Sequence, residues 1–144
     1  PSAVLALGAN ITTNQRSISS DDYFIGMFET ALNSNEIITE ISFPIPDKSS
    51  YIKFPNPASR YAMVGVFMAK TGNKVNVAIT GASENGVFRS SEIENALTAN
   101  FTLESIDGLN ISSDGLISDI HASSSYRANL IKEMAKRALK EIIT

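Results

Sequence analysis

The sequence contains no cysteine and no tryptophan, and His121 is the single histidine among its 144 residues. Without cysteine, the chain cannot form disulfides, use a thiolate as a nucleophile, or bind zinc and iron–sulfur clusters through sulfur. One histidine leaves little material for a multi-histidine metal site or a Ser–His–Asp triad. No nucleophile and base can be paired from the remaining residues. The sequence therefore predicts neither catalytic residues nor a metal site within this chain.

Long apolar runs and clustered charges are also missing. No apolar run approaches the ~20 residues that a membrane-spanning helix needs. The net charge is −3 and the basic residues form no run, so electrostatic binding to nucleic acid or to an acidic membrane is not expected. No glycine-rich strand-to-helix loop is present to hold a phosphate. We expect a cytoplasmic protein, and the length suits one domain that buries roughly 68% of its unfolded surface.

The spacing of the apolar residues predicts an α+β fold, in which an antiparallel sheet of three to four strands packs with helices. In the segment 61–70 both alternating sets of side chains are mostly apolar, so this strand should be central and covered on both faces. Gly65 within it would allow a close approach of another backbone or side chain. Strands are predicted at 3–7, 36–46, 51–54, 61–70 and 74–82, and helices at 20–32, 92–97, near 103–106, and from 123 nearly to the end.

Two apolar runs, 51–54 and 61–66, flank a Pro-Asn-Pro-Ala-Ser connection. Proline fixes φ and lacks an amide donor, so this connection should turn the chain. If the hairpin folds about Pro57, Lys53 and Tyr61 lie opposite each other and face one site. From the spacing alone, the simpler interpretation is a surface lysine and a half-buried tyrosine of the sheet.

Ile38 lies on the otherwise polar face of the strand 36–46, together with Glu40 and Ser42. An isolated exposed apolar side chain needs no explanation, but it could equally contact a ligand or a second domain. Arg60 could reach an anion, although a solvated or salt-bridged arginine is the simpler interpretation. His121 precedes the last helix and is interpreted as a structural or exposed residue.

Several stretches, in this order along the chain, resemble the C-terminal domain of the FAD-binding (medium) flavoprotein subunit of carbon monoxide dehydrogenase. Related molybdenum hydroxylases, including xanthine dehydrogenases and aldehyde oxidoreductases, share this domain. The stretches are SDDYFIGMFETAL (20–32), EIITEISFP (36–44), YIK (51–53), RYAMVGV (60–66), VAITGA (77–82) and SDIHASSSYR (118–127).

The resemblance implies a part of a redox enzyme. In that family the medium subunit binds FAD between an N-terminal domain with glycine-rich loops and this C-terminal domain. Electrons arrive from a molybdenum cofactor in a large subunit through two 2Fe–2S clusters in a small subunit, and the flavin passes them to an acceptor. Residues 17–144 resemble the C-terminal domain. Residues 1–16 resemble the last strand and linker of the FAD-binding domain, whose flavin loops are absent here, so this chain alone is expected to be inactive and to bind FAD weakly.

Three positions match cofactor contacts of the family. Ile38 matches an apolar residue that contacts the cofactor, and Lys53 matches a lysine that contacts FAD. Tyr61 matches a position at which some members place an aromatic side chain near the isoalloxazine ring. The alternative is a stand-alone α+β module that binds a ligand or a protein partner.

Overall fold

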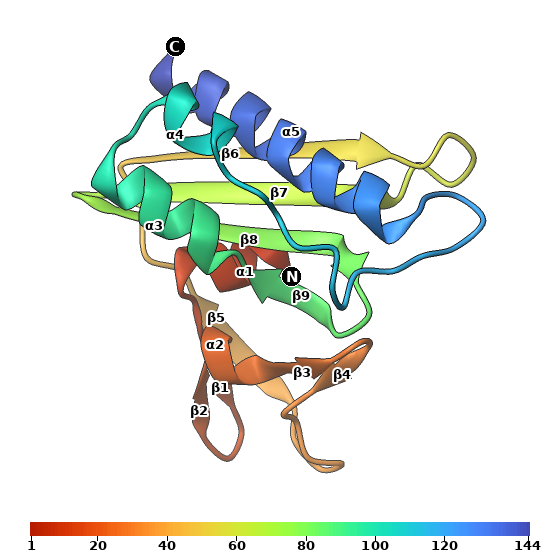
Figure 1. Cartoon of the computed structure of the whole chain (residues 1–144). Coiled ribbons are helices and arrows are strands. Elements are labelled where there is room, and N and C mark those ends of the chain that lie inside the picture. Colours follow the sequence, from red (N-terminus) through yellow and green to blue (C-terminus); the bar gives the residue numbers. More distant parts are fainter.

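The computed structural model describes all residues from 1 to 144 and shows a four-stranded antiparallel sheet flanked by helices, with a smaller lobe beside it (Figure 1). The helices are α1 (Ser2–Leu7), α2 (Ser20–Tyr23), α3 (Ser91–Ala99), α4 (Leu103–Asp107) and α5 (Ser124–Ile143). The strands are β1 (Asn10–Thr13), β2 (Ser17–Ser19), β3 (Phe24–Gly26), β4 (Glu29–Thr30), β5 (Ile38–Ser42), β6 (Lys48–Pro55), β7 (Ala62–Thr71), β8 (Lys74–Ser83) and β9 (Gly86–Arg89).

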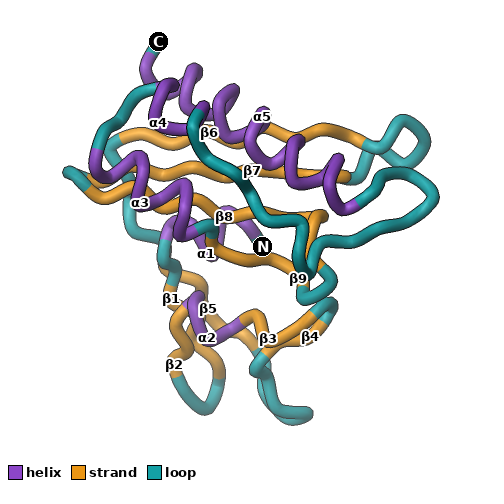
Figure 2. Tube along the Cα trace, viewed as in Figure 1, coloured by secondary structure: helices purple, strands orange, loops and turns teal.

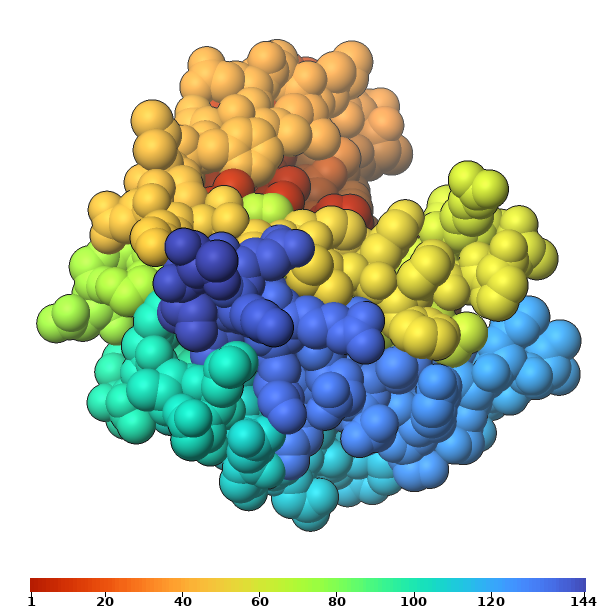
Figure 3. All heavy atoms as spheres, turned by 90° about the horizontal axis from the view of Figure 1, so that it is seen from above, coloured from red at the N-terminus to blue at the C-terminus, as the bar shows by residue number.

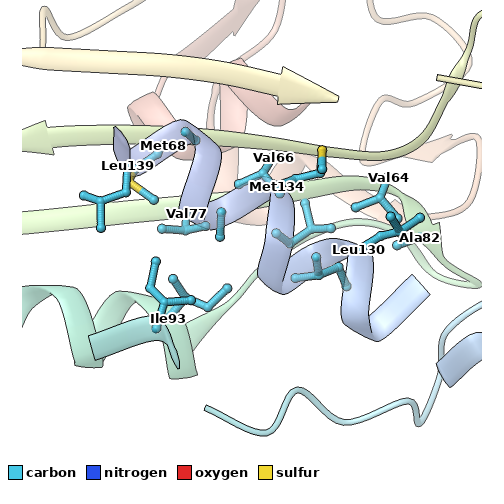
Figure 4. Packing of buried hydrophobic residues seen from close by; sticks show 14 of the residues in the cluster. Val64, Val66, Met68, Val77, Ala82, Ile93, Leu130, Met134 and Leu139 are labelled. Carbon is cyan, nitrogen blue, oxygen red and sulfur yellow. The ribbon is translucent and has the colours of Figure 1, made fainter. Parts of the chain in front are cut away.

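The main sheet has the strand order β6-β7-β8-β9, with every pair antiparallel. One of its faces is covered by α3, α4 and α5, and the main hydrophobic core lies there. Figure 4 shows Leu130, Met134 and Leu139 of α5 against the valines and methionine of β7, with Ile93 of α3 below β8. The buried side chains recur along α5 at helical spacing, which is the pattern that lets a helix pack on a sheet.

The opposite face of the main sheet is covered only in part, by α1. Leu5 and Ala6 of this short helix pack on Ala78 of β8, and Phe67 of β7 lies beside them. The Asn76 side chain donates a hydrogen bond to the Ala6 carbonyl at 2.7 Å, which fixes the helix on the strand. The half of this face nearer the β6–β7 loop remains open.

The smaller lobe contains a three-stranded sheet, β2-β1-β5, and the hairpin β3-β4 (Figure 2). Its own core is small and is formed by Ile11, Ile18 and Tyr23. Glu36 holds the lobe together: its buried carboxylate accepts hydrogen bonds from Arg16 and Thr13 and from the backbone N–H of Asn33. These bonds hold the pKa of Glu36 at about 2, below its usual value of 4.5, with the Arg16 hydrogen bond as the main cause.

The predicted α+β class is confirmed, as are the β7–β8 hairpin, the position of β7 between two covered faces and the short helix α4. The start of α5 is also where the sequence predicts it, because the Ser123 hydroxyl accepts a hydrogen bond from the Tyr126 N–H. The close approach expected at Gly65 occurs, and the neighbour is the Tyr51 side chain. None of the helices combines the length and the hydropathy that a transmembrane span requires.

The strand predicted at 3–7 is wrong, because this segment is helix α1. A short apolar run does not distinguish a buried strand from a buried helix. The end of the helix explains the outcome: Gly8 has a φ of 66°, and its N–H bonds back to the Leu5 and Val4 carbonyls. That left-handed cap is accessible to glycine at little cost.

The helix predicted over 20–32 is also wrong beyond its first turn. Ser19 caps α2, which ends at Tyr23, and the chain then forms the β3-β4 hairpin. Phe28 turns the hairpin with a φ of 61°, which a helix does not contain. Strands β1, β2 and β9 are not predicted from the sequence, and β6 begins at Lys48, before the predicted start at 51.

Candidate functional site

A pocket of about 740 Å³ occupies the part of the main sheet that α1 leaves open. Its walls come from the β3-β4 hairpin, from β6, from the end of the β6–β7 loop, and from β8 and β9. In Figure 3 the surface is hollowed between the orange atoms of the smaller lobe and the yellow atoms of the β6–β7 region. The lining includes Phe24, Met27, Phe28, Glu29, Tyr51, Lys53, Tyr61, Thr80, Gly81 and Val87.

The floor of the pocket follows from the alternation of side chains on β6. Tyr51 and Lys53 are two residues apart and therefore lie on one face of the strand. Tyr51 pairs with Phe67, and Lys53 pairs with Gly65. Because Gly65 has no side chain, the Tyr51 ring extends across this position. The Lys53 ammonium donates a hydrogen bond to the Arg60 carbonyl at 3.0 Å and so ties the strand to the loop.

The β6–β7 loop is built around Asn56. Its side chain accepts hydrogen bonds from the N–H groups of Ala58 and Ser59, and its backbone N–H bonds to the Tyr61 carbonyl at 2.7 Å. Arg60 closes the turn with a φ of 61°. This geometry places Tyr61 outside the strand ladder, with 80% of the residue exposed.

The predicted pairing of Lys53 with Tyr61 is therefore wrong, because Lys53 lies opposite Gly65. The ladder shifts register between Phe54 and Pro55, and the loop between the paired residues Pro55 and Ala62 is wider than a turn about Pro57 would be. Both side chains nevertheless line the same pocket. The structure thus brings together the lysine and the tyrosine by a route different from the one that the sequence predicts.

Ile38 is not among the residues that line the pocket. It lies on β5, an edge strand whose five residues are all exposed. Other large exposed apolar side chains also lie on the smaller lobe. They are Ile25, Phe28, Ile37, Ile41, Phe43 and Ile45, and we call these residues and Ile38 the apolar rim.

The hairpin wall of the pocket carries the apolar side chains of Phe24, Met27 and Phe28 and the polar side chains of Glu29 and Thr30. Phe28 is fully exposed at the hairpin tip, and its φ of 61° is uncommon for a bulky residue. Gly86 fits against the hairpin because a side chain there would lie 3.0 Å from the Gly26 carbonyl oxygen. Sequence reasoning missed Phe28 and Tyr51, although the two-residue spacing of Tyr51 from Lys53 on a strand was a usable signal.

Arg127 hydrogen-bonds the backbone of the strands that border the pocket. This residue of α5 is buried, and its guanidinium donates hydrogen bonds to the carbonyls of Met63 at 2.7 Å and Gly81 at 3.1 Å and to the Asp119 carboxylate at 2.8 Å. Backbone N–H groups of Ala122 and His121, together with Arg127, lower the pKa of Asp119. The arginine therefore joins β7 and β8 where they border the pocket.

The chemistry of the pocket is that of a binding site. Most of the exposed lining surface is apolar, and polar groups come from Lys53, Glu29, the phenols of Tyr51 and Tyr61, and the hydroxyls of Thr30, Thr80 and Ser83. Such a combination suits a flat, largely apolar ligand with a polar edge. No group of three or more His, Asp or Glu side chains could hold a metal ion.

Curated relatives of the chain are medium subunits of oxidoreductases. It is 28% identical to the nicotine 6-hydroxylase medium subunit of Paenarthrobacter nicotinovorans over 98% of this chain and 54% of the relative. It is 29% identical to the glyceraldehyde dehydrogenase medium chain of Sulfolobus acidocaldarius, over 99% of this chain and 56% of the relative. The carbon monoxide dehydrogenase medium chain of Hydrogenophaga pseudoflava is 27% identical over 87% of this chain and 47% of the relative.

The fold has a solved counterpart in quinoline 2-oxidoreductase from Pseudomonas putida 86. The match has a TM-score of 0.74 and 21% identity, and it covers 96% of this chain and 53% of that chain. No model of a protein family matches the sequence. The curated relatives confirm the resemblance drawn from the sequence: the chain is similar to medium subunits of nicotine 6-hydroxylase, glyceraldehyde dehydrogenase and carbon monoxide dehydrogenase, and it spans about half the length of those it matches.

Proposed function

We propose that this chain forms one wall of the FAD site in the medium subunit of a molybdenum hydroxylase. The observation that supports the proposal is the pocket itself: in a homologue of medium subunits, Lys53 and Tyr61 line one open, mostly apolar hollow. In this assignment residues 17–144 are the domain that caps the flavin, and residues 1–16 are the end of the FAD-binding domain, which would pack on the cap through α1 on β8 and through β1 between β2 and β5.

The residues present fit a flavin better than they fit a phosphate. Lys53 offers one cationic donor to a polar or anionic part of the cofactor, and Tyr61 offers a ring that packs beside the isoalloxazine and limits solvent access. The aromatic wall formed by Phe24 and Phe28 supplies apolar contact. A bound flavin would accept electrons and pass them to an acceptor, while these side chains orient it and exclude water.

The apolar rim supports a protein partner at the edge of the same site. The seven large apolar side chains of the rim are exposed on this one lobe, and exposed apolar surface on soluble proteins marks interaction sites. We assign the rim to contact with the remaining part of the medium subunit. Ile38 does not line the pocket, so it would touch a part of the cofactor that extends beyond the pocket. The iron–sulfur small subunit and the molybdenum large subunit complete the proposed assembly.

The direct test is flavin retention in the complete medium subunit, expressed from its full coding sequence. Lys53→Ala should lower the FAD content per protein after gel filtration, because the cofactor loses a charge-assisted donor. Lys74→Ala is the matched control, since Lys74 is exposed at the β7–β8 turn and lies outside this pocket. Equal flavin occupancy in both variants would refute the assigned role of Lys53.

The chain of residues 1–144 should bind FAD weakly or not at all by itself, because it contributes one wall and no phosphate-binding loop. Isothermal titration of FAD into the purified chain measures this. Micromolar or tighter binding would contradict the proposal and would favour a stand-alone ligand-binding module.

A further inference from the structure

The Tyr51 hydroxyl is a polar group of the pocket with no hydrogen-bond partner in the protein. Tyr51 has 42% of its surface exposed, and it lines the pocket next to Lys53. Burial raises the pKa of its phenol, so the group remains protonated and able to donate at neutral pH. A partly buried phenol usually finds a partner for its hydroxyl.

The position of the Tyr51 ring is set by two neighbours on β7. A side chain at Gly65 would place its Cβ 2.6 Å from the Tyr51 hydroxyl oxygen and 3.1 Å from its ring carbon Cε2. The absence of that Cβ gives the ring its space. Phe67 packs beside the ring, with the centroids 6.3 Å apart and the planes tilted by 32°. The ring is therefore directed along the floor of the pocket.

We propose that the Tyr51 hydroxyl is a binding group of the pocket that hydrogen-bonds the polar edge of the flavin, and that Gly65 is required to hold it there. The proposal rests on the assignment of the pocket to FAD. Lys53 is held near the loop by its bond to the Arg60 carbonyl, so the two residues present donors at separate points of the floor. Two such points fix the rotation of a flat ligand, which one lysine cannot do.

A mutant cycle on the complete medium subunit tests this inference. FAD is removed from each variant and titrated back, with flavin fluorescence and the absorption bands of the bound flavin as readouts. Tyr51→Phe should weaken FAD binding about three- to tenfold, as expected for one lost hydrogen bond, and should shift the flavin bands. Gly65→Ala should produce a similar loss, because the new methyl group displaces the hydroxyl. The double variant should bind no more weakly than Tyr51→Phe, since both changes remove one interaction.

Tyr126→Phe is the matched control: Tyr126 has 44% of its surface exposed, lies on α5 and does not line the pocket. It should leave the affinity and the spectrum unchanged. Wild-type affinity and spectrum in Tyr51→Phe would overturn the inference, even if Lys53→Ala loses flavin and the proposed function stands. Additive losses in the double variant would refute the role of Gly65. A wild-type subunit that takes up no FAD would overturn both proposals.

Discussion

Replacing Arg127 tests how much of the stability of the pocket comes from one buried guanidinium. The side chain joins the Met63 and Gly81 carbonyls to Asp119 across three segments of the chain. Arg127→Met keeps the apolar stem and much of the volume and removes every donor. The Met63 carbonyl would then be left buried without a partner, and the Gly81 carbonyl would be left partly so.

The expected loss follows from these two carbonyls. An unsatisfied buried acceptor costs about 1–3 kcal/mol, and a hydrogen bond from a charged donor contributes about 1.5–3 kcal/mol. Asp119 is more than a third exposed and keeps two backbone donors, so its lost ion pair adds little. We expect Arg127→Met to lower the free energy of unfolding by about 2–4 kcal/mol. That is a large share of the roughly 5–15 kcal/mol of a typical domain.

Urea unfolding followed by circular dichroism measures this loss by linear extrapolation. Arg137→Met is the control on the same helix, because Arg137 is exposed and surface changes usually stay within about 0.5 kcal/mol. Arg127→Lys should fall between wild type and Arg127→Met, since one ammonium cannot reproduce the planar fork of donors. A loss below about 1 kcal/mol in Arg127→Met would show that water or backbone movement satisfies the carbonyls, and the reasoning would fail.

Three further predictions concern the smaller lobe and the strand ends. The lowered pKa of Glu36 contributes stability that is complete above pH 4.5 and is lost as the pH falls toward 2. Glu36→Gln should therefore make the unfolding midpoint less dependent on pH in this acidic range, and an unchanged pH dependence would refute the prediction. Gly81→Ala should destabilise the fold in thermal unfolding, because Gly81 has a φ of 81° and its Cβ would overlap the Ala62 carbonyl; wild-type melting would be evidence against this. Phe28→Gly should raise the free energy of unfolding by about 1 kcal/mol, because glycine adopts the left-handed backbone without strain. It should also weaken flavin binding in the complete subunit. A lower melting temperature would contradict the prediction.

The elements that the sequence predicts correctly are those in which local pattern and tertiary packing agree. Along α5 the apolar stripe, the serine cap and the buried face coincide over twenty residues. The strands β7 and β8 are apolar on both faces, and helices pack on both: α3 and α5 on one face and α1 on the other. Long segments with one strong period leave few alternatives.

The wrong elements are short segments whose neighbours decide their conformation. The apolar residues of 20–32 recur at helical spacing, but Phe24 pairs with Thr30 across a hairpin, and β3 lies beside β9. The left-handed backbone of Phe28 is not signalled by its residue type, since glycine and asparagine are the usual occupants. For α1, proline at the start and glycine at the end were available as helix boundaries, and the apolar run obscured them.

In the candidate site, too, the local sequence pattern predicts some features and tertiary contacts determine the others. Strand alternation places Lys53 on a definite face, and the same rule applied two residues earlier identifies Tyr51. Which residue lies opposite depends on the width of the loop, and Asn56 and Arg60 set that width through hydrogen bonds that no spacing rule contains. Gly65 depends on both the sequence pattern and the neighbouring strand. Its missing side chain is visible in the sequence, but the Tyr51 ring that fills the space is identified only when the register of β6 and β7 is known. A glycine in a strand that is otherwise apolar on both faces is therefore a reason to search the partner strand for the aromatic residue that lies over it, here Tyr51.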